Sequence, residues 1–162
     1  MNLIAIDPGT TRSAYVEMAP GGEIKRWGID ENDAVKYILN HGAFGIHYLA
    51  VEMVASYGKP VGKEVFQTCL WIGRFVEAHG RKPFTLIERP DVKLHLCHSR
   101  SKVTDGVIRQ RIIDIYGGKE AAIGKKARPG PLYGIKADVW QALALAITWR
   151  DTVGKSEDWE LR

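Results

Sequence analysis

The sequence is poor in cysteine and has no long hydrophobic run. Only Cys69 and Cys97 are present in 162 residues, which argues against a disulfide scaffold and favours a reducing cytoplasm. No apolar segment approaches the roughly 20 residues that a membrane-spanning helix needs, so no membrane partner is expected. The start, from Met1 to Asp7, has the pattern of a strand, and no small-residue cleavage site follows it. We therefore expect no signal peptide.

The composition is that of a folded, water-soluble domain: 45% hydrophobic and 26% charged residues, without internal repeats. The length predicts one domain over residues 1–162, with a flexible tail after about residue 152. A net charge of +4 is modest, but the positive residues gather in the middle and late chain. A surface that contacts a phosphate backbone has this pattern, as does an ordinary solvated lysine-rich surface. The basic residues are Arg89, Lys93, Arg100, Lys102, Arg109, Arg111, Lys119, Lys125, Lys126, Arg128 and Lys136.

The hydrophobic periodicity predicts strands first and then strands alternating with helices. Three strands joined by tight turns precede two later strands, which favours a mixed five-stranded α/β sheet with helices on both faces. The expected strands are 2–7, 13–18, 23–29, 48–53 and 84–88. The expected helices are 30–39, 63–79, 90–97, 103–116 and 136–150, with a Gly- and Lys-rich loop over 117–134.

Three acids stand where this fold would bring them together. Asp7 ends the first strand before Pro8-Gly9, Glu52 ends an apolar central strand, and Asp138 opens the last helix. Ligands of α/β proteins usually bind beyond the carboxyl ends of the strands. Carboxylates suit Mg²⁺ or Mn²⁺, and two such ions about 4 Å apart can promote phosphodiester cleavage. The three acids therefore predict a metal-dependent phosphodiester hydrolase.

Each acid also has a plainer interpretation. An Asp such as Asp7 often begins a turn. Glu52 would be equally satisfied by a salt bridge to a nearby Lys or Arg. Asp138 is placed to complement the dipole of its helix. The metal-site hypothesis therefore depends on the three residues together.

Longer segments resemble the RuvC-like Holliday-junction resolvases, phage-type members included, of the RNase H-like superfamily. The resemblance extends from residue 3 to about 148 and is most specific at its two ends. The similar segments are IAIDPGTTRSAY, LAVE ending at Glu52, VGKEVFQTCLWIGRF, SKVTDGVIRQRI and IKADVWQALALAI. Family members carry an acid on the first strand, one on the fourth, and one or two on the last helix, and Asp7, Glu52 and Asp138 match these positions.

The resemblance implies an RNase H-like fold and Mg²⁺-dependent nicking of four-way and other branched DNA by a homodimer, with water as the nucleophile. Such a protein acts in the cytoplasm of a bacterial or phage-infected cell. We expect Asp7 to bridge two metal ions, with Glu52 and Asp138 each helping to hold one. The products would carry a 5′-phosphate and a 3′-hydroxyl.

The sequence departs from the family at two places. Many relatives have a second acid one turn into the last helix, where this chain has Gln141. Asp105 is a candidate for the missing fourth acid, although an Asp at that place more often caps a helix. Relatives also place an aromatic wedge soon after the strand-four acid. Tyr57 is the candidate here, and an ordinary surface tyrosine is the alternative.

Further candidates follow from chain position. Lys102 and Arg109 would contact phosphates near the site, and Lys125, Lys126 and Arg128 would form a mobile basic arm in the loop before the last helix. The helix over 63–79 has apolar residues to spare, which makes it the candidate dimer surface, although burial in the core explains them equally well. Those residues are Phe66, Leu70, Trp71 and Phe75.

Other functions remain open to different degrees. The sugar-kinase and actin superfamily has a similar phosphate loop, but its members need two domains and a later Gly-rich motif. A nuclease acting on RNA or RNA–DNA hybrids would use the same acids. A non-catalytic junction-binding protein would tolerate Gln141. The run from His95 to His98 lacks the paired four-ligand spacing of a zinc site.

Overall fold

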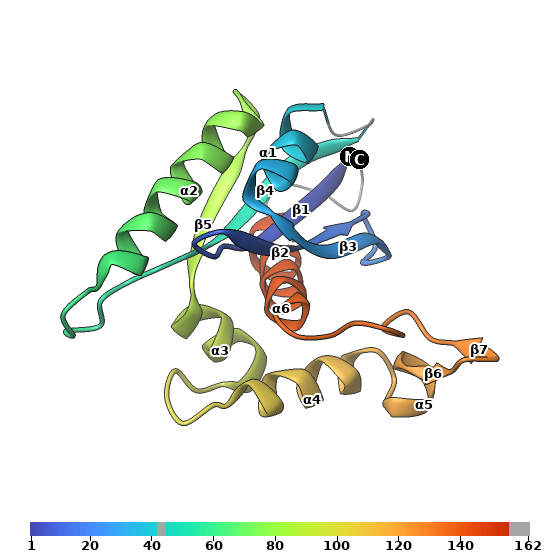
Figure 1. Ribbon diagram of the computed structural model, residues 1–162. Helices are drawn as coiled ribbons and strands as arrows, with labels where there is room; N and C mark the ends of the chain where they lie inside the picture. The colour runs from blue at the N-terminus through green and yellow to red at the C-terminus, as the bar shows by residue number, and fades with distance from the viewer. Residues whose placement is uncertain (42–44, 156–162) are drawn as a thin grey trace.

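A five-stranded mixed sheet forms the centre of the protein (Figure 1). The structure, a computed structural model, describes residues 1–41 and 45–155. The strand order is β3-β2-β1-β4-β5, antiparallel among the first three strands and parallel from β1 to β4 to β5. The strands are β1 (Asn2–Asp7), β2 (Arg12–Met18), β3 (Ile24–Glu31), β4 (Ile46–Met53) and β5 (Phe84–Glu88). This confirms the predicted fold class and sheet.

Helices cover both faces of the sheet, because the side chains of its central strand alternate between two cores. Ile4 and Ile6 of β1 pack with α1 (Asn32–His41) and α2 (Lys63–His79), whereas the alternate residues of β1 pack against α6 (Val139–Trp149). Figure 1 shows α1 and α2 on one side of the sheet and α6 on the other. The central strand is thus fixed from both sides, and Asp7 at its end takes a defined position.

The last helix is buried on every side. All residues of α6 are buried, because the helix lies between the sheet and a second layer made by α3 (Arg89–Cys97) and α4 (Asp105–Ile115). Gln141, which stands where many relatives have a second acid, is buried with the rest of the helix. Asp138 precedes the helix as its N-cap residue, so its side chain lies at the rim rather than in the core.

The segment before α6, predicted to be a loop, contains regular structure. A short helix, α5 (Lys119–Ala122), leads into a two-stranded hairpin of β6 (Gly124–Lys125) and β7 (Arg128–Pro129). A Cβ atom on Gly130 would come within 2.3 Å of the Ala121 and Ala122 carbonyl oxygens, so the chain after β7 packs directly on α5. The predicted mobile arm is therefore a hairpin supported by a helix.

A helix N-terminus supports the turn after β1. The helix α1 begins at Asn32 rather than at the expected Asp30, because Asp30 and Glu31 still pair with β2. The buried Asn32 side chain donates to the Gly9 carbonyl at 3.0 Å and accepts from the Ser13 hydroxyl at 2.6 Å. Gly9 N–H in turn donates to Ser13 Oγ at 3.2 Å. These bonds hold the turn that follows Asp7.

The end of the described chain continues α6. A π-helical turn, η1 (Arg150–Gly154), extends it, and most of the predicted flexible tail, from residue 156 on, lies outside the described residues. Both cysteines are free thiols. Within residues 1–41 and 45–155, no helix is long and apolar enough to cross a bilayer.

Candidate active site

Asp7 and Glu52 end neighbouring strands. In the parallel register of β1 and β4, Ile6 lies opposite Val51, so the next residue of each strand is one of the two acids. The Asp7 side chain is partly buried, and the Glu52 side chain is 13% exposed. The turn after Asp7 requires a glycine, since a Cβ on Gly9 would lie 2.2 Å from the Arg12 carbonyl oxygen. Local sequence therefore fixes the backbone on which this acid pair stands.

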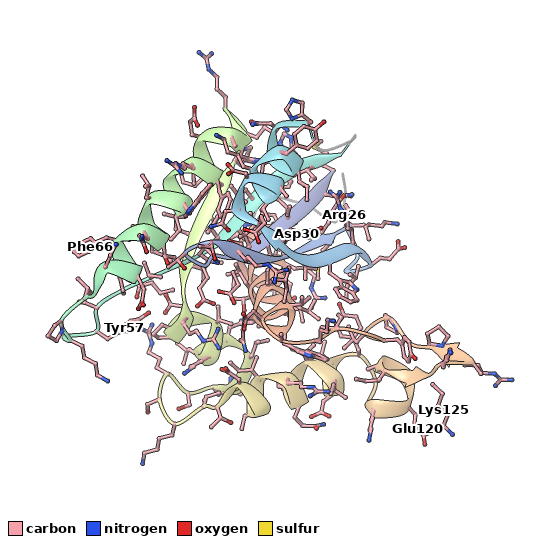
Figure 2. The ribbon with its side chains drawn as sticks, viewed as in Figure 1. Arg26, Asp30, Tyr57, Phe66, Glu120 and Lys125 are labelled. Atoms are coloured by element: carbon pink, nitrogen blue, oxygen red, sulfur yellow. The ribbon has the colours of Figure 1, made fainter. Side chains whose placement is uncertain are left out.

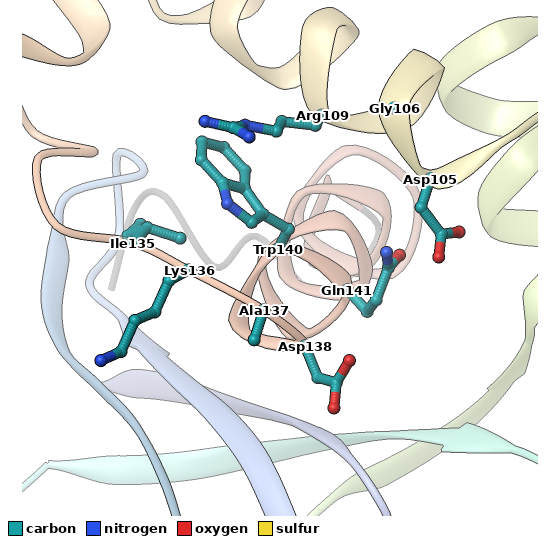
Figure 3. Close-up of a pocket in the computed structure, with 9 residues that line it drawn as sticks. All are labelled: Asp105, Gly106, Arg109, Ile135, Lys136, Ala137, Asp138, Trp140 and Gln141. Atoms are coloured by element: carbon teal, nitrogen blue, oxygen red, sulfur yellow. The ribbon is translucent and has the colours of Figure 1, made fainter.

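A pocket at the start of α6 collects the other candidates (Figure 3). Asp105, Asp138 and Gln141 all line this cavity of about 450 Å³. Asp105 is the first residue of α4, whose Thr104 cap accepts a hydrogen bond from Val107 N–H. Thr104 thus provides the capping that sequence reasoning offered as the alternative role of Asp105. In Figure 3 the carboxamide of Gln141 points toward the side of the pocket from which Asp105 projects.

The acids affect one another electrostatically. Burial, followed by the charge of Glu52, raises the pKa of Asp7 from 3.8 to about 8; Asp138 and Asp105 act in the same direction and Arg89 opposes them. Burial also raises the pKa of Glu52, against the lowering effect of Arg89. Because Asp7 experiences all three other carboxylates, the structure brings the predicted acids into one electrostatic cluster. An ionised Asp7 there needs a compensating cation.

Arg89 is a member of this cluster that sequence reasoning missed as a site residue. Its guanidinium donates to Glu52 Oε2 at 3.3 Å and to Asp105 Oδ1 at 2.5 Å. Burial lowers the pKa of Arg89, but the two carboxylates outweigh it and the pKa is raised. Arg89 directly follows β5, the parallel neighbour of β4. That position at the carboxyl end of a strand is the signal in the sequence, where Arg89 otherwise stands out only as part of the basic segment.

The predicted DNA-contacting residues divide into two groups. Arg109 lines the acid pocket and lies over the Trp140 ring, 4.9 Å from its centroid. Lys102 precedes α4 and has a positive φ of 60°. Tyr57 is 56% exposed in the β4–α2 loop, and the pKa of its hydroxyl is raised by burial and by Glu88 and Glu52. Arg109 and Tyr57 therefore lie near the acids, whereas Lys102 is placed only by its position three residues before Asp105 in the chain.

The second group lies on the hairpin, away from the acids. Lys125 and Arg128 are paired across β6 and β7, and Lys126 stands in the turn between them. All three are exposed, and none lines the pocket that holds Asp138. Figure 2 shows Tyr57, in the β4–α2 loop, and Lys125, on the hairpin, on opposite sides of the molecule. The hairpin can therefore extend a predicted DNA-contacting surface but cannot contribute to the acid cluster.

The chemistry of the side chains suits a divalent cation. Asp7, Glu52 and Asp138 offer carboxylate oxygens, which Mg²⁺ and Mn²⁺ prefer. Gln141 adds a buried Oε1 atom that has no hydrogen-bond partner among the described residues. In that same part of the chain, no group of three His, Cys, Asp or Glu side chains is already arranged as a metal cage. The oxygen ligands suit a divalent ion in kind, while in this structure Arg89 forms ion pairs with Glu52 and Asp105.

The proposed dimer surface on α2 is partly contradicted. Phe66 and Leu70 are 64% and 56% exposed. Phe75, however, is fully buried, and Trp71 is partly buried against the same core. Phe75 is therefore a core residue, because the helix turns that face toward α1 and the sheet. The exposed apolar face reduces to Phe66 and Leu70 in the first half of α2, and Figure 2 labels Phe66 there.

The architecture is that of the RNase H-like fold as RuvC proteins have it. The structure matches RuvC of Thermus thermophilus with a TM-score of 0.69 and 17% sequence identity, over 95% of this chain and 97% of that one. It also matches T. thermophilus RuvC in complex with a Holliday junction substrate, with a TM-score of 0.69 and 16% identity, over 95% and 96% of the chains. No protein-family model and no curated protein sequence matches this chain.

Proposed function

We propose that this protein is a Mg²⁺- or Mn²⁺-dependent endonuclease that cleaves four-way and other branched DNA. The observation that carries the proposal is the convergence of Asp7, Glu52 and Asp138 at one edge of the sheet, seen in their effect on the Asp7 carboxyl. The neighbouring fold is that of a T. thermophilus protein studied in complex with a Holliday junction substrate. This likeness favours a branched DNA substrate over an RNA–DNA hybrid.

The three acids would hold the cation, and the surrounding side chains would hold the DNA. When bound, a divalent cation supplies Lewis acidity for attack of water on a phosphodiester. Asp7 and Glu52 fix the position of that charge because both stand on buried, adjacent strands. Asp138 approaches from the start of α6. Hydrolysis would leave a 5′-phosphate and a 3′-hydroxyl.

Positive and aromatic groups beside the acids suit a bent or branched backbone. Arg109 and Lys136 line the same pocket as Asp138 and provide cations for the flanking phosphates. Tyr57, exposed in the β4–α2 loop, is placed to stack on an unpaired base. The hairpin with Lys125, Lys126 and Arg128 would extend the contact along one arm of the DNA.

Paired nicks in a four-way junction need two active sites, and we propose a homodimer for that reason. Phe66 and Leu70 form the exposed apolar part of α2 that a second copy would cover. A single apolar pair is a small contact, so further polar residues of α2 would have to complete the interface. The oligomeric state is measurable independently of cleavage.

The decisive experiment is a strand-by-strand cleavage assay on a synthetic four-way junction, a linear duplex, a flap and an RNA–DNA hybrid, each with Mg²⁺, Mn²⁺ or EDTA. We expect cleavage of the junction only with a divalent cation. Preferential cleavage of the hybrid would replace the proposal with a ribonuclease. Junction binding without cleavage under any metal would identify a non-catalytic junction-binding protein.

Asp7→Asn is the variant that tests the site assignment. It should abolish cleavage and retain junction binding, because the basic and aromatic groups are unchanged. Asp30→Asn is the matched control, since Asp30 lies on β3 and contacts Tyr15 rather than the acid cluster. Near-normal cleavage by Asp7→Asn would show that the site is assigned wrongly.

A further inference from the structure

Arg89 is built into the acid cluster rather than placed at its margin. Its side chain is 23% exposed and pairs with two carboxylates at once, Glu52 and Asp105. The two partners come from different elements, the end of β4 and the start of α4. A planar guanidinium is suited to bridging two carboxylates in this way, and it keeps its charge at any physiological pH. The cluster therefore already contains one permanent positive charge.

Gln141 removes a negative charge from the same cluster. Its residue is 7% exposed, and its Oε1 atom is buried without a hydrogen-bond partner in residues 1–41 and 45–155. A buried hydrogen-bond acceptor without a donor is energetically unfavourable, so a ligand that contacts Gln141 Oε1 would remove that cost. Figure 3 shows the carboxamide within the pocket shared by Asp105 and Asp138. An amide oxygen can bind a cation but does not attract a second one by charge.

These two features change the charge balance in the same direction. Arg89 adds a positive charge beside Glu52, and Gln141 withholds a negative charge where a carboxylate would be useful. Both lower the attraction of the site for divalent ions. One bound ion together with Arg89 nearly neutralises the carboxylates of Asp7, Glu52, Asp138 and Asp105. A second ion would have to bind against a fixed guanidinium.

We propose that Arg89 serves as the second cation of this site, so that each protomer binds one divalent ion tightly through Asp7, Glu52 and Asp138, with Gln141 as a neutral oxygen ligand. This inference rests on the proposed function for the identity of the metal-binding acids. It replaces the expectation of two ions for this chain. It also makes Arg89 a positioning residue, because it holds Glu52 Oε2 and competes with the ion for that oxygen.

The test is the number of Mn²⁺ ions bound per protomer, measured by electron paramagnetic resonance of free Mn²⁺ and by calorimetry on the full chain without DNA. The wild type should bind one ion. Arg89→Gln should bind the first ion on the order of tenfold more tightly, because a neighbouring positive charge is removed. Gln141→Asp should add a second binding event. The double variant should bind two ions clearly.

Arg26→Gln is the matched control for the charge change. Arg26 pairs with Glu17 at 2.9 Å, and the Glu17 side chain is 10% exposed, so this substitution also removes a guanidinium from a buried glutamate. Glu17 lies opposite Ile4, toward the other end of β1 from Asp7. Arg26→Gln should leave Mn²⁺ stoichiometry and affinity as in the wild type. Arg89→Lys keeps the charge and should also bind one ion, which covers the case in which Arg89→Gln does not fold.

Two wild-type ions of similar affinity would overturn the inference, as would an Arg89→Gln protein that is folded and binds Mn²⁺ no differently from the wild type. The proposed function fails in a distinguishable way. Cleavage of the junction with two bound ions would refute the role of Arg89 and leave the nuclease intact. One bound ion without cleavage of any substrate would support the role of Arg89 and refute the nuclease.

Discussion

Asparagine in place of Asp7 should stabilise the metal-free protein. Burial, followed by the Glu52 charge, raises the pKa of Asp7 from 3.8 to about 8. The unfolded chain therefore loses this proton near pH 3.8, whereas the folded chain keeps it to about pH 8. The stability that the protonated Asp7 carboxyl contributes is fully present below the unfolded-state pKa of 3.8, and it is lost as the pH rises through the folded-state pKa of about 8. At about 1.36 kcal/mol per pH unit, the loss by pH 7 reaches an upper bound of about 4 kcal/mol.

Asparagine carries no charge and so avoids this loss, and we expect a gain of about 1–3 kcal/mol at pH 7 after relaxation of the unfolded and folded chains. The assay is urea unfolding in EDTA at several pH values between about 5 and 8, followed by the same series with Mg²⁺. The advantage of Asp7→Asn should grow with pH. Added Mg²⁺ should stabilise the wild type and leave the variant unchanged.

Asp138→Asn is the matched comparison. Asp138 is exposed and its side chain makes no capping hydrogen bond, so its replacement should change the unfolding free energy by less than about 0.5 kcal/mol. Both variants should nevertheless lose cleavage. A metal-free Asp7→Asn protein that is less stable than the wild type, or whose advantage does not vary with pH, would refute the electrostatic account of the cluster.

Three further results are expected. Arg109→Gln should weaken junction binding for all sequences and lower the slope of log affinity against log salt by about 1 in fluorescence titrations, because one phosphate contact is lost. Phe66→Asp with Leu70→Asp should give monomers in sedimentation, whereas Tyr37→Asp on α1, with 63% exposure, should not. Burial lowers the pKa of His79 below 6.5, so its neutral ring supports folding above that pH and the support is lost as the pH falls. His79→Gln should flatten the urea-measured stability curve between about pH 7 and pH 5.

Local pattern was sufficient for the sheet and for the placement of the three acids. The central strand β1 is buried on both faces, and its apolar run followed by Pro8-Gly9 marks its end within the sequence itself. Strand β4 likewise has a buried apolar run that leads directly to Glu52. Since parallel neighbours end at one edge, the positions of Asp7 and Glu52 followed from strand order. Only their mutual distance needed the register of the sheet.

Features that depend on tertiary packing were not accessible in this way. A periodic pattern does not distinguish a helix with one buried face from one enclosed on all sides, so the burial of Gln141 on α6 could not be predicted. The sequence left Phe75 open between a dimer surface and the core, because the packing of α2 against α1 decides which face of α2 is buried. The strands of the hairpin with Lys125 are too short to produce a pattern. The role of Arg89 requires knowing that β5 lies beside β4.

The cluster that results is unfavourable for folding and useful for binding a cation. Four carboxylates converge on a partly buried edge, and burial, followed by repulsion from the neighbouring carboxylates, raises the pKa of Asp7. Arg89 relieves part of it by pairing with Glu52 and Asp105, which lets the chain fold before any ion arrives. The repulsion that remains among the carboxylates favours the binding of a divalent ion. Arg89 therefore affects two properties, the stability of the metal-free protein and the affinity of the site for metal. It affects both because it contacts Glu52 and Asp105 directly.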